Sequence, residues 1–132
     1  MYLKVNLDMK CSDQEKNEML KLIETICDVA DKARCGGLLS IMDEYKNIDN
    51  VLLKSALELM IMGFDHDALM ENFNYLIFSA NFDGRQLLER CIIYEAVLWI
   101  YSGCKKEEIK LLLLSMLGEK WVNEALFPTV KA

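Results

Sequence analysis

Residues 12–33, SDQEKNEMLKLIETICDVADKA, decide the fold class, because they carry a complete helix start followed by a one-sided apolar pattern. Ser12 as N-cap and Glu15 three residues later form a capping box, in which each side chain can satisfy the other's free backbone donor. The apolar positions then recur at intervals of three and four residues: Met19, Leu22, Ile23, Ile26, Cys27, Ala30 and Ala33. This spacing predicts a long helix that packs on one side.

The rest of the chain is also predicted to be helical. Strong helix formers such as Leu, Met, Ala, Glu and Lys dominate, and the single proline, Pro128, lies near the C-terminus. The first helix either stops at Gly36-Gly37 or passes through them with a local weakening. Caps and glycine stops predict further helices over about 38–46, 50–62, 66–82, 85–101, 105–117 and 121–127.

The segment from Tyr2 to Lys10 differs, because apolar and polar residues alternate in it with a period of two. A lone strand has no partner within this chain, so the segment is predicted to be an ordered arm on the helices or a strand paired across a homodimer. We therefore expect a single all-α domain over residues 1–132. An extended arm (1–11) would precede a compact bundle of about six helices (12–132).

Two stretches of the chain are similar at an offset of 40 residues. Ala56 corresponds to Ala96, Gly63 to Gly103, and the intervening apolar positions also coincide. Each stretch has a helix, a glycine stop, a polar cap and a second helix, as in repeats of α-hairpins. Two unrelated amphipathic hairpins would align on apolar spacing alone, so both interpretations stay open.

Composition limits the classes of partner. The chain has 15 Lys and Arg against 21 Asp and Glu, a net charge of −6, which disfavours nucleic acid. Charges interrupt every apolar stretch, so no membrane insertion is expected. Five cysteines without a CxxC pair, and one histidine, do not form a zinc pattern. With no signal-type apolar run at the N-terminus, we expect a cytoplasmic protein with reduced thiols and without a metal or cofactor.

His66, between Asp65 and Asp67, is the one imidazole that could act as a general base. The plainer interpretation is that the two acids complement a helix N-terminus and that the histidine is exposed. No nucleophile elbow and no phosphate-binding glycine loop accompanies it. The sequence therefore predicts a protein that is not an enzyme.

The apolar content, 53% of the chain, is high for 132 residues. Four aromatic residues with polar tips could not all be buried without hydrogen-bond partners for those tips: Tyr94, Trp99, Tyr101 and Trp121. Some of this surface is therefore expected to be an interface, either with a protein partner or in a homo-oligomer.

Residues 33–44, ARCGGLLSIMDE, resemble the cytoplasmic stretch of bacterial flagellar stator proteins of the motility protein A type. That family shows Ala/Ser-Arg-x-x-Gly-hydrophobic-hydrophobic-Ser/Ala-Leu-Glu here, and the similarity extends over about residues 28–73. The resemblance implies that Arg34 matches an arginine on a charged surface that acts on the rotor. At the position of the family's acidic residue this chain has Met42, and Asp43 and Glu44 follow directly. The four membrane helices of the family are absent.

The resemblance implies a non-enzymatic interaction module of the bacterial cytoplasm, with Arg34, Asp43 and Glu44 as partner-binding residues. The alternative is a small helical-repeat adaptor or regulator unrelated to motility, organised by the 40-residue hairpin repeat.

Overall fold

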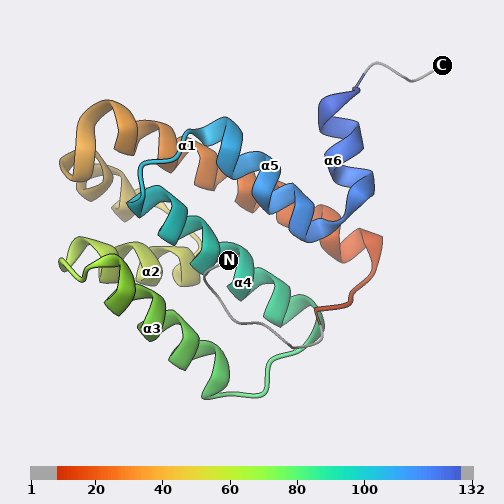
Figure 1. Cartoon of the computed structure of the whole chain (residues 1–132), viewed down its shortest axis with the longest axis horizontal. Helices are drawn as coiled ribbons and strands as arrows, with labels where there is room; N and C mark the ends of the chain where they lie inside the picture. Colours follow the sequence, from red (N-terminus) through yellow and green to blue (C-terminus); the bar gives the residue numbers. More distant parts are fainter. Residues whose placement is uncertain (1–8, 129–132) are drawn as a thin grey trace.

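The computed structural model describes residues 9–128 and is all-helical over that range (Figure 1). In chain order the elements are α1 (Asp13–Glu44), the 3-10 helix η1 (Tyr45–Asn47), α2 (Val51–Ile61), α3 (His66–Phe78), α4 (Gly84–Tyr101), α5 (Lys106–Leu117) and α6 (Glu119–Leu126). No strand occurs between residues 9 and 128. The predicted arm falls mostly on residues 1–8, which lie outside the described residues. The all-α prediction is confirmed.

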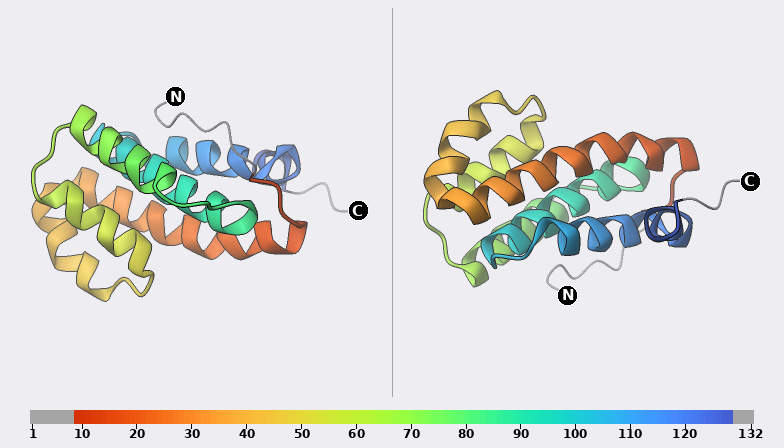
Figure 2. Two further views of the ribbon diagram at one scale, coloured as in Figure 1. Left: turned by 90° about the horizontal axis from the view of Figure 1, so that it is seen from below. Right: turned by 90° about the horizontal axis from the view of Figure 1, so that it is seen from above.

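Helix α4 is the centre of the bundle. It packs against α1, α2, α3 and α5, while α6 packs on α5 (Figures 1 and 2). Eight consecutive residues of α4, from Cys91 to Leu98, are buried. Glu95 interrupts the apolar sequence of this helix, yet its side chain is only 5% exposed. Four helices around this middle part of α4 leave it no solvent face, so its apolar pattern is not one-sided.

The start of α1 follows the prediction. Glu15 N donates to Ser12 Oγ over 3.1 Å, and Ser12 N donates to Glu15 Oε1 over 3.0 Å, which is the reciprocal capping box. The buried side of α1 faces the core through Met19, Leu22, Ile23, Ile26, Val29 and Ala30.

The two glycines after this face interrupt the helix. Gly37 has φ 72° and ψ −164°, outside the helical region, and helical geometry resumes after it as far as Glu44. Such a positive φ favours glycine, because a Cβ would crowd the backbone. Residues 38–44 therefore form a second helical segment, and η1 extends it to Asn47, close to the predicted segment of about 38–46.

The largest difference from the predicted helix bounds lies at the end of α3, and α6 begins at Glu119 instead of about residue 121. Helix α3 stops at Phe78 instead of about residue 82, with Ser79 as its C-cap. The residues that follow form the turn that leads to Asp83 and Gly84 at the start of α4. Ser, Asn and Asp favour such turns because their side chains compete with the helix for backbone hydrogen bonds.

The 40-residue offset also appears in the helix bounds. Helices α2 and α4 end at Ile61 and Tyr101, and α3 and α5 begin at His66 and Lys106. Gly63 and Gly103 follow the first helix of each pair with φ of 99° and 81°. The buried residues of α2 and α3 are Leu53, Ala56, Leu57, Met60, Leu69, Phe73 and Ile77, and each has a buried counterpart 40 positions later.

The two hairpins nevertheless pack differently. Helices α4 and α5 pack against each other, whereas α2 and α3 are each held mainly by α4. As a result, α2 keeps an outer side that no other helix covers. None of the helices in residues 9–128 has the length and apolar content to cross a bilayer.

Candidate functional site

Arg34, the first predicted partner-binding residue, is engaged within the fold. Its Nη1 donates to the carbonyl oxygen of Gly103 over 2.5 Å, in the loop that joins α4 and α5. The side chain also lies close enough to Cys104 for its charge to act on the thiol. Burial raises the pKa of Cys104, Glu108 raises it further, and the Arg34 cation lowers it. Arg34 thus ties α1 to the neighbouring hairpin.

Asp43 and Glu44 lie elsewhere, beside the bend at Gly37. They line a shallow depression of about 360 Å³ together with Lys32, Cys35, Gly36 and Ser40. Glu44 Oε1 is 2.8 Å from Lys32 Nζ, although twelve residues separate the two. In a straight helix they would be about 18 Å apart along the axis. The bend therefore brings Asp43 and Glu44 to Lys32, and Arg34 is not part of this cluster.

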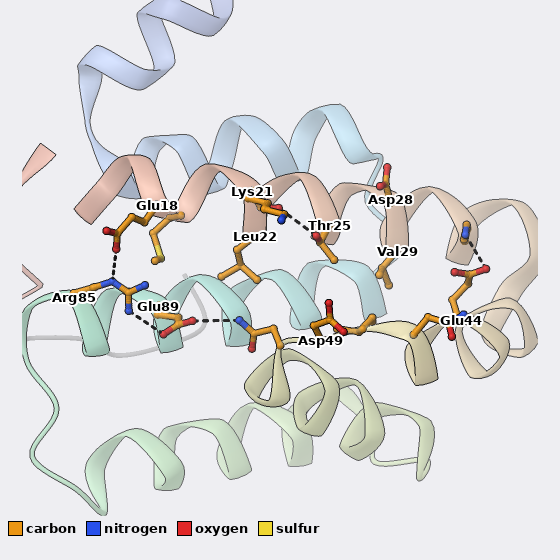
Figure 3. A pocket seen from close by; sticks show the side chains of 15 residues that line it. Glu18, Lys21, Leu22, Thr25, Asp28, Val29, Glu44, Asp49, Arg85 and Glu89 are labelled. Atoms are coloured by element: carbon orange, nitrogen blue, oxygen red, sulfur yellow. Dashed lines mark hydrogen bonds and ion pairs between the residues drawn. The ribbon is translucent and has the colours of Figure 1, made fainter. Parts of the chain in front are cut away.

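A larger groove, of about 450 Å³, runs between α1, α4 and the start of α2 (Figure 3). Its charges are largely paired across the helices. Arg85 Nε is 2.8 Å from Glu18, and Arg85 Nη1 is 3.5 Å from Glu89. Asn50 Nδ2 donates to Glu89 over 3.2 Å. The hydrogen bond with Glu18 raises the pKa of Arg85. These contacts link α1, α2 and α4, and Lys21, Asp28 and Asp49 also line the groove.

His66 is not exposed as the plainer sequence interpretation expected. Its side chain is half-buried and lies against Tyr101, with the ring centroids 5.9 Å apart. Asp65 is occupied as the N-cap of α3, since its Oδ1 accepts from Ala68 N over 2.8 Å. Asp67 Oδ1 is 3.7 Å from His66 Nδ1. The site therefore holds one imidazole and one nearby carboxylate, packed on an aromatic ring.

The aromatic residues that were expected to contribute to an interface differ in their burial. Tyr94 is buried and stacks on Phe73 with the ring centroids 4.6 Å apart. Trp121 is buried and its Nε1 donates to Asn17 Oδ1 over 2.9 Å. Tyr101 is 43% exposed. Burial of these residues was expected to need hydrogen-bond partners for their polar tips, and the structure supplies one for the indole N–H of Trp121.

The apolar surface that the fold leaves open lies over α2. We call it the α2 groove: it measures about 540 Å³ and is lined by Tyr45, Val51, Lys54, Ser55, Glu58, Leu59 and Leu76. Val51 is 72% exposed and Leu76 is 43% exposed. The sequence did not single out these residues, because isolated valine and leucine side chains give no motif; Val51 lies off the buried stripe of Leu53, Ala56, Leu57 and Met60. Helix α2 packs mainly on α4, so its side away from α4 stays in solvent.

One tyrosine–glutamate pair lines the α2 groove, and a second pair lies on α3 outside its lining. The hydroxyl of Tyr45 is hydrogen-bonded to Glu58, which raises the pKa of Tyr45. On α3, Tyr75 donates to Glu71 Oε1 over 3.0 Å, which raises the pKa of Tyr75. A carboxylate has several acceptor positions, so each can still bind a cation.

In the described part of the chain, no three His, Cys, Asp or Glu side chains come together as a metal site. Comparison of the chain with protein-family models, with curated proteins and with solved structures gives no match. What the fold and its surfaces define is an all-helical protein with an open apolar groove.

Proposed function

We propose that this chain is a non-enzymatic protein-interaction module of the bacterial cytoplasm, comparable in role to the cytoplasmic domain of a flagellar stator protein. The observation that supports an interaction role is the α2 groove, where Val51 and Leu76 remain in solvent beside Leu59. Contiguous exposed apolar surface on a soluble fold is typical of a contact site for another protein.

The comparison with stator proteins is supported by the resemblance of residues 28–73. The acidic part of that segment, Asp43 and Glu44, lies on the surface at the bend of α1. Arg34 donates a hydrogen bond to the Gly103 carbonyl oxygen and contributes to this role by fixing the position of α1. On this proposal the bend and the α2 groove, which follow each other along the chain, form one contact region.

A helical-repeat adaptor unrelated to motility is the second candidate. It is supported by the 40-residue correspondence of helix ends and buried positions in α2–α3 and α4–α5. In repeat proteins, stacked units present a surface for partners. Both candidates require a partner protein and differ in its identity.

The experiment is affinity capture from native lysate with the wild-type chain as bait, followed by mass spectrometry. The test bait carries Val51→Lys and Leu76→Lys. The control bait carries Leu111→Lys and Leu126→Lys, which are 37% and 51% exposed on α5 and α6. A partner held by wild type and control, and lost from the test bait, supports the proposal. Equal retention by the test bait contradicts it.

The same capture separates the two candidates. A component of the flagellar motor that is also lost when Asp43→Lys and Glu44→Lys are combined supports the stator-like role. A partner unrelated to motility, insensitive to those two substitutions, supports the adaptor. Thermal melts of each bait check that the changes at these exposed or half-exposed positions leave the fold intact.

A further inference from the structure

Residues 38–47, which we call the flap, lie between the bend of α1 and the residues that lead to α2. They comprise the end of α1 and the 3-10 helix η1. Glu44, labelled in Figure 3, and Asn47 line the larger groove between α1, α4 and α2, while Tyr45 lines the α2 groove. The flap therefore belongs to the walls of both grooves, and its position decides the shape of each.

The flap is joined to the preceding part of α1 through a single residue with non-helical backbone angles. Between Asp13 and Glu44 that residue is Gly37, whose φ of 72° and ψ of −164° are accessible mainly to glycine. A Cβ on Gly37 would meet no atom within 4 Å beyond its chain neighbours, so the surroundings leave room for rotation. Arg34, three residues earlier, donates to the Gly103 carbonyl oxygen and holds the preceding part of α1 in place.

One buried side chain anchors the flap to the core. Among residues 39–47, Ile41 is 2% exposed and is the one buried residue, whereas Leu39 and Met42 are 73% and 42% exposed. Residues 91–98 of α4, by contrast, are all buried. Segments with few buried apolar contacts open at a lower free energy than the core of the same fold.

Two polar contacts add to this anchor. Lys32 Nζ is 2.8 Å from Glu44 Oε1, and these side chains are 47% and 39% exposed. The Tyr45 hydroxyl is hydrogen-bonded to Glu58 of α2. An ion pair at this exposure changes an equilibrium by about two- to fivefold, so Lys32 and Glu44 form a weak latch across the bend.

We propose that the flap opens about Gly37 as a hinge while the other helices stay folded, and that this opening regulates the contact region formed by the bend and the α2 groove. With the flap closed, Lys32 is paired with Glu44, and Tyr45 stands in the wall of the α2 groove. With the flap open, Glu44 is released and the groove loses this wall. A partner that binds the open form more tightly shifts the equilibrium toward it. This inference rests on the proposed interaction function and adds its regulation.

Amide hydrogen exchange of the full chain, read residue by residue by NMR, tests the hinge. The short helical segment is not stable when detached from the core, so opening exposes its amides. Residues 42–45 should share one opening equilibrium and, after correction for intrinsic rates, exchange at least about tenfold faster than residues 91–98. Protection equal to that of residues 91–98, or rates that rise steadily toward the end of the helix as in fraying, would overturn the inference.

A matched pair of variants tests the latch. Lys32→Gln should speed the exchange of residues 42–45 about two- to fivefold, and added salt should reduce the difference from wild type. Lys120→Gln removes the same charge from another exposed ion pair, with Asp13 at 3.4 Å, and should leave this exchange unchanged. Equal effects of the two variants would overturn the inference, because both would then report the stability of the whole fold.

The affinity of the captured partner tests the regulation. Lys32→Gln keeps Asp43 and Glu44, so by raising the open fraction it should tighten binding about two- to fivefold relative to Lys120→Gln. Unchanged or weaker binding would refute the regulation and leave the interaction function in place. Faster exchange in Lys32→Gln without any captured partner would refute the interaction function, and with it the regulation, while the hinge itself stands.

Discussion

Replacing Arg34 by alanine should destabilise the fold by about 1 kcal/mol. The change removes the hydrogen bond from the guanidinium to the Gly103 carbonyl, which joins α1 to the α4–α5 loop. A hydrogen bond from a charged group contributes about 1.5–3 kcal/mol, and this one is exposed, so solvent screening reduces its contribution to about 1 kcal/mol. With an unfolding entropy of about 2.1 cal/mol/K per residue, 1 kcal/mol lowers Tm by about 4 °C for this chain.

Thermal denaturation followed by circular dichroism measures this shift, and thiol alkylation gives a second readout. Since Arg34 lowers the pKa of Cys104, its removal should raise that pKa further and slow alkylation near neutral pH. Arg34→Lys keeps the charge and should preserve more of the thiol reactivity than Arg34→Ala. An unchanged Tm together with an unchanged alkylation rate in Arg34→Ala would refute the structural role.

Three further predictions concern single features of the fold. Burial, and secondarily Glu95, raises the pKa of the Cys91 thiol from 9.0 to about 12, so the folded state holds this proton more tightly than the unfolded state does. The free energy of unfolding should be unaffected below about pH 9 and then fall by about 1.4 kcal/mol per pH unit toward pH 12. In urea melts at several pH values, Cys91→Ala should lack this part of the fall. Equal dependence of the unfolding free energy on pH in both proteins would contradict the prediction. Gly37→Ala should lower the free energy of unfolding by about 1–3 kcal/mol because of the positive φ at this position. Gly36→Ala should lower it less, because the added Cβ meets only the Ser40 side chain. Equal denaturation midpoints for the two variants would argue against the bend. Asn17→Ala should lower the free energy of unfolding by about 1 kcal/mol, because it leaves the Trp121 indole N–H without its acceptor. In a Trp121→Phe background, where this hydrogen bond is already absent, the same substitution should have a smaller effect, and an equal effect would contradict the prediction.

Local signals were sufficient for most helix boundaries. The Ser12–Glu15 capping box, the glycine at position 63 and the Asp65 cap each act within four residues of sequence, so their effect can be deduced without knowledge of the fold. The end of α3 at Phe78 was less predictable, because the residues after it tolerate both helix and turn.

The candidate sites depended on distant contacts. Arg34 finds its acceptor 69 residues along the chain, and no local pattern indicates that pairing. Lys32 and Glu44 meet because one glycine bends α1, and the sequence left open whether the helix would pass through that point. Surface charge could be inferred from sequence, but the partner of each charge could not.

The sequence by itself determined the helical class, the caps and the 40-residue spacing, because each depends on backbone propensity and on the periodicity of side chains along one helix. The tertiary structure decided which apolar residues are buried. Residues 91–98 are buried on every side of α4, whereas Val51 on α2 is 72% exposed. The reason is physical: α4 is surrounded by four helices, whereas the outer side of α2 is left uncovered by α3.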